Sequence, residues 1–425
     1  MSHRFSLTRG AVRVAQALAM LAALPLAQAA TLHVTNLNDT GPGSLRAVVG
    51  AAADGDGVVF DQPGFLTLVS LIDINHNITI DGLSGGAWVQ INGSGATSLF
   101  RVGIGHSATL THLSLINAQN AVQNNGNLTL NQVLARGNTG SMGAAVTGCI
   151  NPATQVLNVI DSYFLENTAT YGGGAVAACG TINISGSTFS ANRAYYGGAL
   201  AVTNTGAVSV VNSTFQGNVA AGPGSIGGFG GGITTDYPGL SLMNVTFSGN
   251  SSPMGSALSV ADGVAATVNN TLFASGSGGR HCTNPIATGA NNLNFGDPAV
   301  GGHSCGPSVS ISADPLLGTL GNNGGPTPTL ALGAGSPAID AGADGPATDQ
   351  RGVARPQGAG VDIGAYERTA APVVPGTGGV TAVPTLDEWG LAGLAALLGF
   401  LALRRMRPDG TGALQKACNH AERKS

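Results

Sequence analysis

A short repeat between residues 156 and 258 constrains the fold of this chain more than any other feature. Each copy contains two apolar residues spaced two apart, a polar turn residue, a Phe, an Asn three residues later and a glycine-rich close. The repeated positions are Phe164, Phe189, Phe215 and Phe247, with Asn167, Asn192, Asn218 and Asn250. The Phe residues lie 25, 26 and 32 residues apart, and no helical segment separates them. This pattern favours a solenoid in which each copy forms one coil.

Stacked parallel strands lie about 4.8 Å apart, so every repeated residue would meet its counterpart in the next coil. We therefore expect an internal ladder of Phe rings and a ladder of Asn amides at a turn. The glycine pairs that close the copies, such as Gly173 and Gly174, mark a bend too tight for side chains. Weaker copies place Leu134 and Phe273 at Phe-like positions. A leucine-rich repeat is excluded because its leucine signature is absent. A β-propeller is excluded because each blade would need roughly 40–50 residues, more than one copy contains.

The composition agrees with an all-β fold of short strands and tight turns. Of 425 residues, 67 are Gly and only 9% are charged, against about 25% charged residues in ordinary soluble domains. Apolar residues make up 43% and recur at period two, which argues against disorder. The formal net charge is −4, and the only lysines are Lys416 and Lys424. No basic stripe for nucleic acid is predicted.

The first residues predict export. Residues 1–30 read as a signal peptide, with an arginine-containing start, an apolar stretch over 14–26 and a small-x-small site ending at Ala29. Residues 31–57 follow as a strand and a short helix. Ser44 would cap this helix, and its apolar face (Leu45, Val48, Val49 and Ala52) would cover the N-terminal end of a β-helix over residues 58–280.

Cysteine positions test the register of the coils. Cys149 lies three residues after Val146, and Cys179 lies three after Val176, so both occupy one slot in consecutive coils. The stacking distance falls inside the roughly 4.4–6.8 Å range of bridged Cα atoms, which predicts a disulfide. Cys282 and Cys305 form the second predicted pair. Neighbouring His281 and His303 would suggest zinc only if these cysteines stayed reduced, which export disfavours. Cys418 is left over.

The C-terminal third of the sequence differs in composition from the repeats. Residues 281–368 concentrate the sparse charges, with Arg351 and Arg355 near Asp349, Asp362 and Glu367, and we expect a closing segment for the solenoid. Residues 369–383 form a Pro/Gly linker. Residues 384–407 combine a short motif with an apolar stretch and arginines, which predicts a transmembrane helix, followed by a cytoplasmic basic tail over 408–425. The motif residues are Pro384, Thr385, Leu386, Trp389, Gly390, Arg404 and Arg405.

Three C-terminal strings, GSPAIDAG, DQRG-x-x-RP and VDIGAYE, resemble secreted bacterial proteins with right-handed parallel β-helix repeats and a choice-of-anchor type region. This resemblance implies a single-stranded right-handed parallel β-helix of the pectate-lyase-like kind, with about nine coils. The tail VPTLDEWG is similar to the IPTL-CTERM sorting signal, with Val383 where Ile is usual. Such tails imply an exosortase-like sorting transpeptidase as partner. They also imply a location at the Gram-negative cell envelope or surface, with at least transient anchoring by the C-terminal helix.

Parallel β-helices include pectate lyases and polygalacturonases, so a polysaccharide lyase or glycoside hydrolase is the alternative function. These enzymes need clustered or paired carboxylates. Between residues 107 and 275 the acidic residues are Asp161, Glu166, Asp236 and Asp262. Asp161 takes the turn slot of Asn212 and Asn244, and Glu166 should point outward. The sequence therefore favours a protein without catalytic residues, cofactor or metal.

A tyrosine cluster is the best candidate for binding. Tyr171, Tyr195 and Tyr196 lie between the repeated Asn and Gly of adjacent copies. Aromatic rings on a polar face can bind sugar rings, although the same tyrosines would equally suit the rim of a turn. We therefore predict an exported adhesion, display or matrix-binding scaffold, with surface or matrix polysaccharide as its partner.

Overall fold

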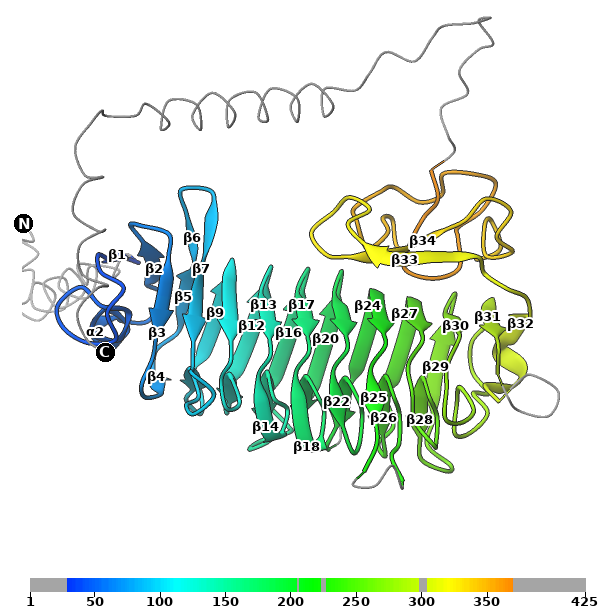
Figure 1. Ribbon diagram of the computed structural model, residues 1–425, viewed down its shortest axis with the longest axis horizontal. Helices are drawn as coiled ribbons and strands as arrows, with labels where there is room; N and C mark the ends of the chain where they lie inside the picture. The colour runs from blue at the N-terminus through cyan, green and yellow to red at the C-terminus, as the bar shows by residue number, and fades with distance from the viewer. Residues whose placement is uncertain (1–28, 205, 223–226, 298–303, 370–425) are drawn as a thin grey trace, which may run out of the picture. The chain divides into compact units, whose positions relative to one another are not determined.

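The chain folds as a parallel β-solenoid. The computed structural model describes residues 29–204, 206–222, 227–297 and 304–369. Figure 1 shows successive coils side by side along one axis, from the N-terminal strands to β32. This agrees with the predicted β-helix of about nine coils.

The largest sheet of the described residues has 20 strands, and most coils contribute two of them. Its strands are β1 (Thr31–Val34), β2 (Gly57–Phe60), β3 (Phe65–Thr67), β5 (Ile78–Asp81), β6 (Leu83–Ser84), β7 (Ala87–Asn92), β9 (Ser107–Thr111), β10 (Leu113–Ile116), β12 (Asn127–Asn131), β13 (Leu134–Arg136), β16 (Val156–Ile160), β17 (Tyr163–Leu165), β20 (Thr181–Ser185), β21 (Thr188–Ser190), β24 (Val208–Gln216), β27 (Leu240–Ser248), β29 (Ala266–Asn269), β30 (Leu272–Ala274), β31 (Asn292–Phe295) and β32 (Val309–Ile311). Except for the antiparallel β6–β7 hairpin, these strands pair in parallel.

Two smaller parallel sheets complete the coils. The eight-stranded sheet in the described region contains β4 (Ile72–Ile74), β8 (Phe100–Val102), β11 (Val122–Asn124), β15 (Val146–Gly148), β19 (Val176–Ala178), β23 (Leu200–Val202), β26 (Ile233–Thr235) and β28 (Leu258–Val260). The four-stranded sheet contains β14 (Thr139–Met142), β18 (Thr168–Gly172), β22 (Arg193–Ala194) and β25 (Val219–Ala220). A coil such as β16–β19 therefore has three faces, because its first two strands belong to one sheet.

Side-chain ladders run through the core as predicted. The rings of Phe164 and Phe189 stack with centroids 4.6 Å apart, and the stack continues through Phe215 and Phe247 to Phe273. Each Asn Nδ2 donates to the Oδ1 of the next Asn at 2.9 Å. The prediction for Leu134 was wrong: Ala135 pairs with Phe164, so the small Ala135 occupies the Phe slot.

Two backbone features shape the corners of each coil. At the bend after β18, a methyl group on Gly174 would lie 2.0 Å from the carbonyl oxygen of Gly198, so only glycine fits there. At the corner inside the large sheet, one residue per coil adopts a positive φ. Among the described residues this corner column contains His112, Gln132, Asp161, Gly186, Asn212, Asn244 and Asn270.

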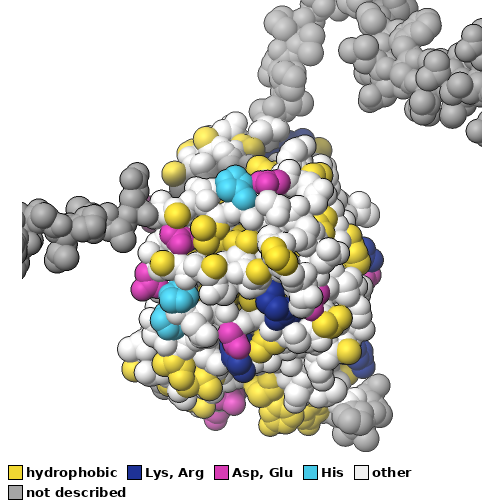
Figure 2. All heavy atoms as spheres, turned by 90° about the vertical axis from the view of Figure 1, so that its left-hand side faces the viewer, with side chains coloured by type: hydrophobic (Ala, Val, Ile, Leu, Met, Phe, Trp, Pro, Cys, Tyr) yellow, Lys and Arg dark blue, Asp and Glu magenta, His cyan; other side chains and the backbone are white. Residues whose placement is uncertain are grey.

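The N-terminal end is covered by helix α2 (Leu45–Ala51), as predicted. The backbone N–H of Ala47 donates to the Ser44 hydroxyl, which caps the helix. Leu45 and Val49 are buried against the first coil. Figure 2 views the molecule from the left-hand side of Figure 1, where most of the surface is uncharged and several acidic side chains lie beside an Arg or a His.

The C-terminal region differs from the predicted closing segment over residues 281–368. The solenoid continues past residue 280 through β31, the 3-10 helix η2 (Gly306–Ser308) and β32. Residues 312–368, here called the strap, then turn back and lie along the corner column (Figure 1). Their one hairpin among the described residues pairs β33 (Leu317–Gly321) with β34 (Thr329–Leu332).

Polar contacts hold the strap on the solenoid. Asn212 Nδ2 donates to the Thr348 carbonyl at 2.7 Å, Asn244 Nδ2 to the Asp362 carbonyl at 3.0 Å, and Asn270 Nδ2 to the Ala343 carbonyl. Inside the strap, the predicted charge pairs form between Arg351 and Asp349 and between Arg355 and Glu367. The turn residues of the repeat thus satisfy the strap backbone, which sequence periodicity does not reveal.

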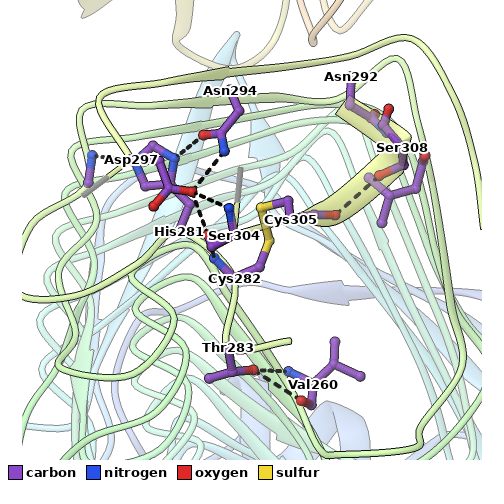
Figure 3. The surroundings of a disulfide bond; sticks show 12 residues. Val260, His281, Cys282, Thr283, Asn292, Asn294, Asp297, Ser304, Cys305 and Ser308 are labelled. Carbon is purple, nitrogen blue, oxygen red and sulfur yellow. Dashed lines mark hydrogen bonds between the residues drawn. A yellow bond between two sulfur atoms is a disulfide. The ribbon is translucent and has the colours of Figure 1, made fainter. Parts of the chain in front are cut away.

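Both predicted disulfides are present. Cys149 pairs with Cys179, with 5.2 Å between their Cα atoms, and Cys282 pairs with Cys305, with 5.0 Å. The second bond joins the last coils and lies beside His281 (Figure 3). Because both thiols are consumed, Cys282 and Cys305 are disulfide-bonded and do not ligate zinc. His303 lies outside the described residues.

Candidate functional site

The tyrosine cluster lies where the four-stranded sheet meets the glycine bend. Tyr171 ends the exposed part of β18, and Tyr195 and Tyr196 follow β22. Bridges between neighbouring coils align Gly172 with Tyr196, Tyr196 with Phe229, and Phe229 with Met254. A column of large side chains therefore crosses several coils on the outer surface, with 54% of Tyr171 and 47% of Met254 exposed.

The rings of this column contact one another in an extended chain. Tyr171 and Tyr196 meet edge to face with centroids 5.1 Å apart, and Tyr196 stacks on Phe229 at 5.5 Å. Tyr195 meets Tyr196 edge to face at 4.3 Å. Such contacts hold the Tyr196 ring between its neighbours, so its orientation is fixed before any ligand arrives.

A cavity of about 310 Å³ opens beside these rings. Its walls are Met142, Tyr171, Gly172, Tyr196, Ala201, Val202, Thr203, Thr234, Asp236 and Tyr237. We call this cavity the aromatic pocket. Its floor comes from the adjacent strands β23 and β26, where Ala201 pairs with Thr234. The volume lies at the lower end of the range for small-molecule sites.

The three predicted tyrosines do not act alike. Tyr171 and Tyr196 line the aromatic pocket, whereas Tyr195 is not one of its walls. A methyl group on Gly227 would lie 2.7 Å from the Tyr195 hydroxyl, so that hydroxyl is tucked against the following coil. The rim interpretation therefore describes Tyr195, and the binding interpretation remains for Tyr171 and Tyr196.

The polar groups of the pocket are hydroxyls and one carboxylate. Burial, followed by neighbouring Tyr195, raises the pKa of the Tyr196 hydroxyl, so this group stays protonated and can donate a hydrogen bond. Asp236 is exposed and is the one charged side chain among the described pocket walls. The arrangement combines aromatic faces with acceptors and donors suited to a polyhydroxylated ligand.

Sequence reasoning missed Phe229, Tyr237 and Asp236. The loop after β26 differs in length from the loops after β23 and β28, so Asp236 and Tyr237 have no counterpart at a fixed spacing. Phe229, by contrast, stands four residues before Ile233, as Tyr196 stands four residues before Leu200. Phe229 reaches the tyrosine column only because the stacked coils bring its backbone next to Tyr196. The spacing from the following strand could therefore have identified Phe229, whereas no repeat spacing identifies Asp236 and Tyr237.

The residues considered for catalysis lie apart from one another. Glu166 forms an exposed ion pair with Arg136 at 3.1 Å, and Asp161 lies in the corner column. In the part of the chain that the structure describes, no three His, Cys, Asp or Glu side chains converge on one point.

Comparisons with known proteins identify the C-terminal motif. The model of the IPTL-CTERM motif matches residues 381–408. This range contains every residue predicted for the sorting signal, from Pro384 to Arg405, and confirms that signal. The match supports an exported protein of the cell surface. These residues, the linker over 369–383 apart from Thr369, and the tail over 408–425 lie outside the described residues.

The other comparisons add little. No curated protein matches the chain. The crystal structure of pectate lyase Pel9A is similar at 13% identity and a TM-score of 0.48, covering 80% of this chain and 98% of that chain. Within the described residues no helix is long and apolar enough to cross a membrane; the span predicted over 384–407 falls beyond them.

Proposed function

We propose that this protein is an exported, envelope-anchored β-helix scaffold that binds a surface or matrix polysaccharide in the aromatic pocket, without catalysis. The observation that carries the proposal is the pair Tyr171 and Tyr196, whose rings border a cavity that also contains Asp236. Sugar rings present apolar C–H faces to aromatic side chains and hydroxyl groups to polar ones. The aromatic pocket offers both kinds of partner in one place.

The charge of the pocket favours one class of sugar. Asp236 would repel a carboxylated sugar and accept hydrogen bonds from hydroxyl or amino groups, and no basic residue is found among the described pocket walls. We therefore expect neutral or amino sugars to bind better than uronic acids. A pectin-like polymer, which is rich in carboxylates, is a poor fit to this site.

A glycan array tests the proposal. Full-length protein is applied to neutral, amino-sugar and uronate polymers, and retention on the first two classes is expected. The same polymers are incubated with the protein and Ca²⁺ and followed by ultraviolet absorbance, which rises when a lyase creates a double bond. Absence of retention on every neutral and amino-sugar polymer contradicts the binding proposal, and a rise in absorbance supports the enzyme alternative.

The C-terminal tail is the basis for the proposed anchoring at the cell envelope. An exosortase-like transpeptidase would recognise the IPTL-CTERM motif, and the apolar helix over 384–407 would hold the protein in the membrane until processing. The choice-of-anchor type region would then be the strap. If the signal is cleaved, the intact mass of the surface form corresponds to a chain that ends before Gly390. A surface form that retains residues 390–425 would contradict cleavage.

A further inference from the structure

One position of the corner column, Gly186, has no side chain, and it lies next to the acidic side chain of Asp161. Asp161 precedes Gly186, which precedes Asn212, and all three adopt a positive φ. Gly186 has no side chain, and a methyl group there would lie 2.0 Å from Asp161 Oδ1. The Asp161 carboxylate therefore leans over Gly186 into the space between Asp161 and Asn212.

Asn212, the next residue of the corner column, carries a second side-chain oxygen. Its side chain is buried, with 8% exposed, and its Nδ2 donates to the Thr348 carbonyl of the strap at 2.7 Å. That bond fixes the orientation of the amide. Asn212 Oδ1 is consequently a buried acceptor without a hydrogen-bond partner among the described residues. An unpaired buried acceptor is costly, and such groups in folded proteins usually meet a water or an ion.

Asp161 and Asn212 both line one cavity of about 270 Å³ between the coil and the strap. The strap supplies Thr348, Asp349, Gln350, Arg351 and Gly352 to its wall. We call this cavity the strap cavity. Its volume leaves room for an ion with several water molecules.

The basic residue of the strap cavity does not neutralise Asp161. Arg351 donates its Nε to Asp349 Oδ2 at 2.8 Å and one terminal nitrogen to the Asn323 carbonyl at 3.2 Å. Its guanidinium also stacks 3.6 Å from the ring centre of Tyr366. Burial raises the pKa of the Asp161 carboxyl, and no nearby cation opposes this effect. Within the described residues Asp161 has neither an ion pair nor a side-chain hydrogen bond.

We propose that the strap cavity binds Ca²⁺, with the Asp161 carboxylate and Asn212 Oδ1 as protein ligands and water as the remainder. Carboxylate and amide oxygens are ligands that Ca²⁺ accepts in flexible, six- to eight-fold geometry, whereas Mg²⁺ requires near-ideal octahedral geometry. A single carboxylate places the site in the weak class, with a dissociation constant of about 10⁻⁴–10⁻³ M, as in extracellular modules.

Bound Ca²⁺ would join the strap to the solenoid. The ion would lie against residues 348–352 and a coil that begins about 190 residues earlier in the chain, so the strap could open only after the ion leaves. By mass action, amide exchange through that opening slows by the factor 1 + [Ca²⁺]/Kd. At about 10 mM Ca²⁺, roughly tenfold above the upper end of the expected range, exchange at 348–352 should slow at least tenfold.

Hydrogen exchange read by mass spectrometry tests this on the full-length protein, in Ca²⁺, in chelator, in Mg²⁺ and in NaCl of equal ionic strength. The decisive variant is Asp161→Asn, which preserves the turn because Asn212, Asn244 and Asn270 adopt the same positive φ in other coils. We expect wild-type protein and the control Asp262→Asn, changed at an exposed carboxylate, to show Ca²⁺-dependent slowing at 348–352. Asp161→Asn should show none.

Three results would overturn the proposal. Exchange in wild-type protein could be the same with Ca²⁺ and with chelator. The slowing could persist in Asp161→Asn. NaCl or Mg²⁺ could reproduce it, which would assign the effect to ionic screening or to a less selective site.

Discussion

His281 shows how one buried side chain can make the stability of the last coils depend on pH. It is fully buried, the backbone N–H of Gly276 donates to its Nε2 at 3.2 Å, and its Nδ1 contacts Asn294 Oδ1 (Figure 3). This network assigns the proton to Nδ1 and leaves Nε2 as an acceptor. Burial lowers the pKa of His281, and the bond to Asn294 and the charge of Asp297 oppose that shift only in part.

The lowered pKa predicts a loss of stability in mild acid. An unfolded His takes up a proton near pH 6.5, whereas His281 in the folded protein does so only at lower pH. Between these two values the unfolded chain binds more protons, so the free energy of unfolding falls as pH falls from about 6.5. Urea unfolding between pH 5 and 8 measures this slope, and His281→Gln should flatten it. Equal slopes in both proteins would contradict this account of His281.

Two pairs of adjacent residues show what residue spacing does and does not determine. His281 next to Cys282 would have suggested zinc only with reduced cysteines, and the predicted disulfide forms instead. Tyr195 and Tyr196 are adjacent in sequence, but only Tyr196 lines the aromatic pocket. Tyr196 stands four residues before Leu200, as Phe229 stands four residues before Ile233, and this shared spacing places Tyr196 rather than Tyr195 in the aligned column.

Among the elements, the Asn ladder binds the coils most regularly. Asn192 accepts hydrogen bonds at Oδ1 from the backbone N–H and the Nδ2 of Asn167. Its own Nδ2 donates to Asn218 Oδ1 and to the Phe164 carbonyl, at 2.9 and 3.0 Å. The ladder begins one coil earlier than predicted, because Asn138 Nδ2 donates to Asn167 Oδ1.

Asn192→Ala should destabilise the protein by about 3 kcal/mol, because it leaves several buried polar groups without partners. Asn183→Ala is the matched control. Asn183 also bonds an Asn of a neighbouring coil, Asn158 in the preceding one, but it is exposed, so water replaces the lost bond and the change should stay within about 0.5 kcal/mol. Urea unfolding of the two variants gives both values. Comparable losses would show that burial does not set the strength of the ladder.

Periodicity predicted those elements that repeat and failed where the chain stops repeating. The Phe and Asn ladders and the bond between Cys149 and Cys179 follow from register alone. Leu134 was misassigned because its copy is weak and the register differs by one residue. The strap has no periodic counterpart, and its contacts with Asn212, Asn244 and Asn270 link residues more than 70 positions apart.

In the whole molecule, two different surfaces of the solenoid contact the strap and form the aromatic pocket. The corner column carries the strap, and the opposite end of each coil, near the glycine bend, carries the aromatic pocket. The first surface is occupied by the chain itself, whereas the second remains open to a ligand. The sorting signal at 381–408 would deliver this open surface to the cell envelope.

The affinity for a retained neutral or amino-sugar glycan, compared between two single variants, shows whether the aromatic pocket binds the sugar. Tyr196→Ala removes the ring between Tyr171 and Phe229 and should raise the dissociation constant about tenfold or more, with an unchanged unfolding midpoint. Tyr195→Phe removes a hydroxyl that lies against Gly227 and bonds the Tyr196 hydroxyl, but it keeps both pocket rings, so it should raise that constant much less than Tyr196→Ala does. We expect this contrast in a titration of full-length protein with the glycan. Equal affinities of Tyr196→Ala and wild-type protein would contradict it.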